Sequence, residues 1–201
     1  MPWIFGPPFE GHPRIVEMRE LKRFDVCTRA KAFKTRTEAY FLRQVDALTS
    51  DEIWAPFPLA LMTCVGIEMI GAYKYGDAAA DRNGHFKRLL KDMSPRFGES
   101  QLTPEGRTEE LAVFLYKGFR NSLAHGFYGK WVFITNDPKK TATLRYSPTR
   151  HLVVLNVNWF YRRFKEVAQA YLESLSRATD ETADPLLTFD QTFRRNFVAW
   201  L

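Results

Sequence analysis

The stretch Pro58–Tyr73, PLALMTCVGIEMIGAY, decides the fold of this chain. Apolar side chains occupy nearly every position, and Glu68 is the single charged residue within it. A helix that is apolar on all sides needs neighbours on all sides, so this stretch predicts a helix at the centre of a packed core. Gly66 and Gly71 are expected to let neighbouring segments approach that helix closely.

Helical patterns continue on both sides of this central stretch. Before it, Thr35–Leu48 places four apolar residues on one stripe: Tyr40, Phe41, Val45 and Leu48. After it, further helices are predicted at His85–Met93, at Thr108–Ala124, after a cap at Asn158, and in a last segment that ends at Leu201. Thr108 is the expected cap of the second of these helices. The helix after Asn158 repeats apolar residues at helical spacing: Phe160, Phe164, Val167 and Tyr171.

A late region of the chain has a different pattern. Lys130–Thr135, Thr141–Tyr146 and His151–Val157 are short β-rich runs, and turn-forming residues separate them. They predict a small antiparallel meander at about 130–157. The expected fold class is therefore mainly α: a bundle of four to five helices with this meander inserted.

The length of 201 residues predicts one domain with a sizeable core. Residues 1–34 are expected to form an N-terminal arm with an irregular or helical lead-in, and residues 35–201 the helical domain. With 29 basic and 23 acidic residues, the net charge of +6 favours polyanionic partners such as nucleic acid.

The cellular compartment can be predicted from cysteines and apolar runs. Two cysteines, Cys27 and Cys64, do not suggest a disulfide framework. The first residues lack the pattern of a signal peptide, and the apolar run Ile53–Ile67 is short for a bilayer and contains two prolines. We expect a cytoplasmic protein without a membrane partner.

The clearest chemical signal is the stretch RNSLAHG at residues 120–126. Arg120 carries a permanent charge on a planar fork that fits phosphate, and His125 can exchange protons near neutral pH. Together they could cleave RNA through its 2′-hydroxyl, with Asn121 orienting either group and no metal or cofactor. A histidine near a helix C-terminus also stabilises the helix, so the motif alone leaves a structural role open.

Helix geometry constrains this motif. On an uninterrupted α-helix, positions 120 and 125 are about 140° apart, whereas Lys117, Asn121 and His125 share one stripe. Arg120 and His125 could meet at one phosphate if the helix unwinds towards Gly126. They could also meet if two copies of the chain pair through this helix around a two-fold axis.

Arg120-Asn121-Ser122-Leu123-Ala124-His125 resembles the R-[N/D/H]-x3-H signature of the HEPN superfamily (higher eukaryotes and prokaryotes nucleotide-binding). The Leu-Ala-His-Gly tail, the position late in a long helix, and the earlier apolar helix with Glu68 agree with it. Some members continue to R-x4-H-x-Y, and a partner antitoxin modifies that tyrosine. Position 127 is Phe127 in this chain, which argues against that route of regulation.

The resemblance implies a HEPN-like helical bundle that forms a homodimer through the motif helix, which is the helix predicted at Thr108–Ala124. It implies a metal-independent endoribonuclease of a toxin or defence system, with RNA as substrate and an antitoxin as partner. Arg120, His125 and Asn121 would be catalytic, and Glu68 and Lys117 would support them. The alternative is a non-catalytic HEPN-like module that binds a nucleotide or RNA, or that serves dimerisation.

Two other groups of residues are candidates for RNA contact. Arg162, Arg163 and Lys165 are expected to form a solvated helix face. Aromatic and basic residues also alternate near the C-terminus, at Phe193, Arg194, Arg195, Phe197 and Trp200. That alternation suits base stacking, but we favour docking of an amphipathic helix on the core. No spacing of Cys and His suggests a zinc site.

Overall fold

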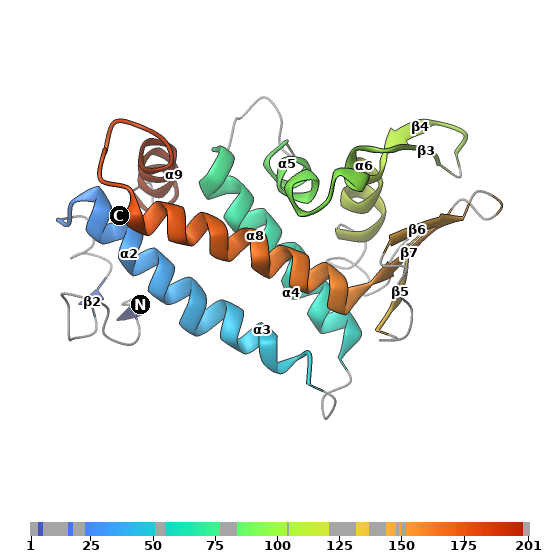
Figure 1. Ribbon diagram of the computed structural model, residues 1–201, viewed down its shortest axis with the longest axis horizontal. Helices are drawn as coiled ribbons and strands as arrows, with labels where there is room; N and C mark the ends of the chain where they lie inside the picture. Colours follow the sequence, from blue (N-terminus) through green and yellow to red (C-terminus); the bar gives the residue numbers. More distant parts are fainter. Residues whose placement is uncertain are drawn as a thin grey trace.

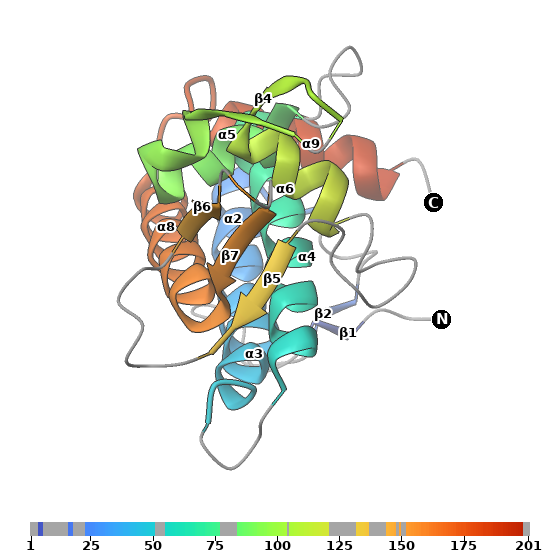
Figure 2. The ribbon, with the colours of Figure 1, turned by 90° about the vertical axis from the view of Figure 1, so that its right-hand side faces the viewer.

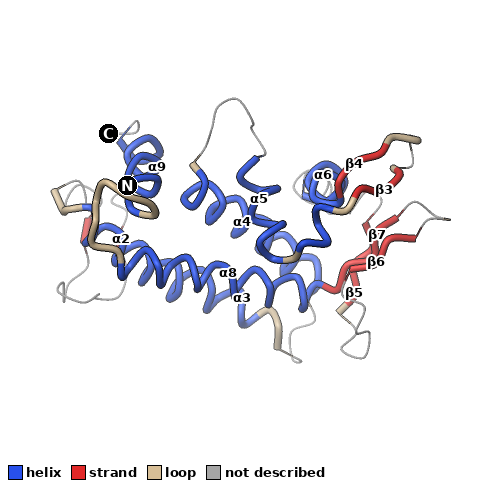
Figure 3. The backbone as a smooth tube through the Cα atoms, turned by 45° about the horizontal axis from the view of Figure 1, so that its top comes forward, coloured by secondary structure: helices blue, strands red, loops and turns tan. Residues whose placement is uncertain are grey.

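The computed structural model describes residues 4–5, 16–17, 23–50, 55–76, 84–103, 105–120, 132–136, 144–147, 149 and 152–198. Over these residues the chain is mainly α-helical, as its sequence predicts, with three small sheets. The helices form most of the body, and β3 to β7 gather at one end of it (Figures 1 and 3). Near the other end, β1 (Ile4–Phe5) pairs with β2 (Val16–Glu17).

Helix α4 (Pro56–Tyr75) confirms the predicted central helix. It packs against α5 (Gly84–Met93), α8 (Val157–Arg177) and α9 (Leu186–Val198). By length and composition alone α4 could cross a membrane, and half of its apolar window is buried inside the protein.

Both glycines of α4 lie where a neighbour comes close. A Cβ atom at Gly66 would lie 2.5 Å from the Phe164 ring of α8. One at Gly71 would lie 2.8 Å from the carbonyl oxygen of His85 in α5. Any side chain at either position would therefore push α8 or α5 away from the central helix.

The N-terminal helical segment has three parts. Helix α2 (Val26–Arg36) starts at a cap in which Asp25 accepts a hydrogen bond from the Thr28 amide. The chain continues through a π-helix, η1 (Thr37–Leu42), into α3 (Arg43–Ala47). This segment runs beside α8, and α2 also packs on α9 (Figure 1).

The π-helix changes which side chains of this segment reach the core. Val45 is buried and Phe41 and Leu48 are half-buried, but Tyr40 is 41% exposed. The expectation that Tyr40 shares their stripe is wrong. A π-helical turn holds more residues than an α-helical turn and so shifts the register, and Leu42 occupies the buried face instead.

The segment predicted as one helix from Thr108 to Ala124 begins as a strand. Thr108–Glu110 forms β4 and pairs antiparallel with β3 (Ser100–Leu102). Helix α6 (Leu111–Leu115) then starts with Glu110 at its cap position, so the expected cap at Thr108 is wrong. The strand pairing satisfies the backbone groups of β4, and an α-helix could not use them at the same time. A second π-helix, η3 (Tyr116–Arg120), follows α6.

The late sheet contains the three predicted strands: β5 (Val132–Thr135), β6 (Leu144–Ser147) and β7 (Leu152–Asn156). Their order is β5-β7-β6, and β5 runs parallel to β7, so the antiparallel meander is wrong in topology. Strand β7 takes the centre because it buries Val153 and Leu155 completely.

The last two helices close the core. Asn156, rather than Asn158, caps α8 by accepting a hydrogen bond from the Trp159 amide. The predicted stripe of α8 is confirmed, with Phe160, Phe164 and Tyr171 buried and Val167 half-buried.

A 3-10 helix, η2 (Pro95–Gly98), inserts Phe97 into the same core. The largest fully buried side chains include these aromatics: Phe86, Phe97, Phe114, Phe119, Phe160, Tyr161, Phe164 and Phe189.

Candidate functional site

The structure brings Arg120 and Glu68 together from two elements that are 52 residues apart in sequence. Arg120 is the last residue of η3, and Glu68 lies near the middle of α4. The Arg120 Nε atom donates to Glu68 Oε2 at 2.7 Å, and Nη2 lies 2.6 Å from the same oxygen. Both side chains are about one third exposed (30% and 29%). The pair therefore sits at the surface of the core, within reach of a bound molecule.

The Tyr116 ring contacts the Arg120 guanidinium in addition to Glu68. It lies one turn earlier in η3, and the guanidinium carbon is 5.6 Å from its ring centroid. The ring is held in turn by Phe86 of α5, which meets it edge-on at 5.2 Å. Burial raises the pKa of Tyr116, and the charge of Arg120 opposes that rise. Tyr116 is absent from the candidates of the sequence analysis, although its spacing of four residues from Arg120 is a signal for such a contact.

The π-helix alters the geometry of the motif itself. Figure 2 shows α6 and its continuation lying beside α4. The offset of about 140° assumes an α-helix, whereas η3 is wound with wider turns up to Arg120. Short π-helical segments are rare and occur frequently at functional sites. Asn121 and His125 lie outside the described residues.

Lys117 makes its contact away from the Arg120–Glu68 pair. Its side chain is 55% exposed, and Nζ lies 2.5 Å from Glu109 Oε1 on β4. Lys117 and Arg120 therefore have different carboxylate partners, although both belong to η3. The structure leaves Lys117 on the outer surface of the motif helix.

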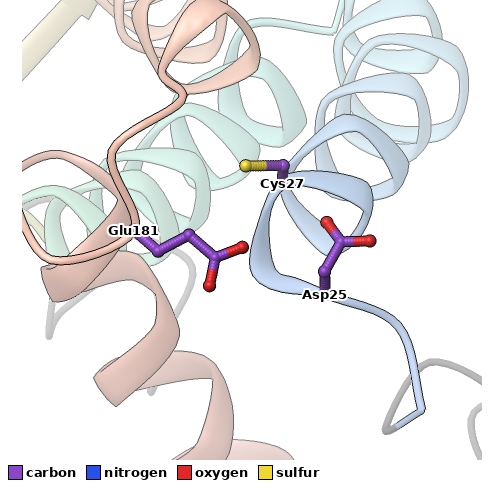
Figure 4. Close-up of side chains that lie close together, drawn as sticks. All are labelled: Asp25, Cys27 and Glu181. Atoms are coloured by element: carbon purple, nitrogen blue, oxygen red, sulfur yellow. The ribbon is translucent and has the colours of Figure 1, made fainter.

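Asp25, Cys27 and Glu181 form a second cluster, which sequence spacing did not predict (Figure 4). One ligand atom of each lies within 4.8 Å of the others. The Asp25 carboxylate already accepts from the amide and hydroxyl of Thr28, and the Cys27 thiol donates to the Ala178 carbonyl. Burial and both carboxylates raise the pKa of Cys27. A cysteine binds a metal as its thiolate. The contacts of Asp25 and Cys27 instead favour a helix cap beside a protonated thiol.

Three of the remaining basic candidates, Arg163, Lys165 and Arg194, are held in contacts within the protein. Arg163 donates to the Met93 carbonyl at 2.8 Å, and Lys165 lies 2.8 Å from the Asp46 carboxylate. On α9, Arg194 pairs with Asp190. Phe193 is 3% exposed, which confirms that α9 docks on the core at this residue.

Comparisons with protein-family models, with curated proteins and with solved structures find no match to this chain. A functional assignment therefore rests on the motif at residues 120–126 and on the contacts around Arg120.

Proposed function

We propose that this protein is a metal-independent endoribonuclease of the HEPN type, acting in the cytoplasm as a toxin or defence factor. The observation that carries the proposal is the ion pair between Arg120 and Glu68. It joins the motif helix to the one acidic residue of the central helix. The resemblance assigns a supporting role to that same position.

The proposed reaction divides its tasks among few side chains. His125 accepts the proton of the 2′-hydroxyl or donates a proton to the leaving oxygen. Arg120 balances the negative charge that develops on the phosphate. Asn121 orients one of these groups. Glu68 holds the Arg120 Nε and Nη2 atoms and so fixes the plane of a guanidinium that has five N–H donors.

The energetics favour orientation as the role of Glu68. Both partners are about one third exposed, and ion pairs near the surface contribute about 1 kcal/mol or less to stability. A fixed guanidinium loses little entropy when it binds a phosphate, because its fork is already arranged. The pair therefore matters more for positioning Arg120 than for the free energy of unfolding.

The test is a cleavage assay with purified protein, single-stranded and structured RNAs, and EDTA in the buffer. We expect cleavage products that end in 2′,3′-cyclic phosphate, since the 2′-hydroxyl is the attacking group. Absence of cleavage on every RNA would contradict the proposal. It would favour the non-catalytic nucleotide- or RNA-binding module, a reading that the internal pairing of Arg120 with Glu68 also supports.

A homodimer through the motif helix is the second part of the proposal. Lys117→Glu is expected to weaken such a dimer at least tenfold, because the two-fold axis introduces the reversed charge twice beside Glu109. Light scattering over a concentration series measures this effect.

Lys91→Glu is the matched control for the dimer. Lys91 is also exposed and pairs with a neighbouring glutamate, Glu110 at 2.8 Å, but it lies on α5. Equal effects of the two substitutions on the dimer constant would contradict an interface at the motif helix.

A further inference from the structure

A cavity of about 480 Å³ opens between α2, η1, α4 and α9. In Figure 1, α2 and α9 lie towards the end of the molecule away from the sheet β5–β7. Buried aromatic side chains of Phe33, Tyr73 and Phe193 line the cavity. Its volume lies in the range of pockets for small planar ligands or single groups of a larger ligand, and is too small for a docked helix.

The cavity and the Arg120–Glu68 pair share helix α4. Met69 and Ala72 contribute to its lining. Met69 directly follows Glu68, and Ala72 lies one helical turn beyond it, where Cβ atoms are about 5–6 Å apart. A molecule bound at Arg120 would reach this cavity by crossing about one helical turn of α4.

The groups at the rim suit a flat heteroaromatic ring. Tyr40 is 41% exposed, and the Arg36 guanidinium lies over its ring at 5.7 Å from the centroid. The exposed Asn196 side chain adds an amide to the lining of the cavity. Bases of single-stranded RNA are recognised by stacking on aromatic rings and guanidinium planes, and by amide contacts to their edges. The rim supplies all three.

We propose that this cavity binds a nucleobase of single-stranded RNA, from a nucleotide next to the phosphate held at Arg120. The inference rests on the proposed RNA substrate, and it names the part of that substrate which the protein contacts besides the phosphate. Tyr40 provides the stacking surface. The π-helix η1 explains its position, because the register shift turns this ring out of the core and towards the cavity.

The test measures binding of a fluorescently labelled single-stranded RNA by anisotropy, in the His125→Ala background so that the RNA stays intact. Tyr40→Ala is expected to raise Kd about tenfold, within the range found for loss of one base–aromatic stack. Tyr40→Phe keeps the ring and should change Kd less than twofold. Phe133→Ala, on strand β5, removes a ring that is 63% exposed and should also leave Kd unchanged.

An abasic scan of the same RNA locates the bound base. One abasic position should weaken binding to the Tyr40-containing protein and have no added effect in Tyr40→Ala. Equal affinities of Tyr40→Ala and its parent, or no RNA binding at all, would overturn the inference. Cleavage that is independent of Tyr40 would leave the nuclease proposal intact, whereas Tyr40-dependent binding without cleavage would overturn the nuclease alone.

Discussion

Arg120→Ala is expected to reduce the rate of RNA cleavage about a thousandfold. A preorganised cation at a transferring phosphoryl group contributes effects of about 10³ to 10⁵ in rate. Arg120 is preorganised by Glu68 on one edge and by the Tyr116 ring on one face. The measurement is the single-turnover rate on one RNA at saturating protein.

Two further variants separate the charge of Arg120 from its orientation. Arg120→Lys keeps the charge but loses the planar fork, so it should recover little of the rate. Glu68→Gln keeps an oxygen acceptor for Nε and should lose only about tenfold, in line with a positioning role. In a double-mutant cycle, Glu68→Gln should add nothing once Arg120 is alanine.

Thermal denaturation provides the control for folding of these variants. Because the pair is partly exposed, the loss of either partner should lower the free energy of unfolding by about 1 kcal/mol. An Arg120→Ala protein that folds and cleaves within threefold of the wild type would contradict the phosphate role.

His125→Ala is expected to reduce cleavage by a factor of about 10² to 10⁴, the usual contribution of a general acid or base. A methyl group can neither accept the proton of the 2′-hydroxyl nor return one to the leaving oxygen. In a bacterial host the wild-type chain should arrest growth, and the His125→Ala chain should not. Growth curves and the cleavage assay measure these two effects.

His12→Ala is the control for His125→Ala, since His12 is isolated in sequence from the motif. It should leave both cleavage and growth arrest unchanged. If His125→Ala and the wild type were equally toxic and cleaved equally fast, the assignment of acid–base chemistry to His125 would be wrong.

Local patterns were sufficient to predict most of the helices. The apolar run around Ile67, the glycines at 66 and 71, and the spacing of Phe160, Phe164 and Tyr171 predict α4 and α8, and the structure confirms them. These predictions succeed because helix periodicity and burial are encoded within a few turns. The same patterns singled out Glu68 and Arg120, but as residues on separate helices.

Other features depend on neighbours that are distant in sequence. Thr108–Glu110 became a strand because Ser100–Leu102 lies beside it, and β5 pairs parallel with β7 on the side opposite β6. The two π-helices have no periodic signal, yet they displace Tyr40 from the core and set the position of Arg120.

The sequence by itself determined the helical class of this protein, its central helix and the chemistry that its motif offers. Only the tertiary structure decided that Arg120 meets Glu68, that Tyr116 covers the guanidinium, and that an aromatic cavity forms between α2, η1, α4 and α9. The physical reason is that side-chain identity is local, whereas a contact between helices depends on how their surfaces pack.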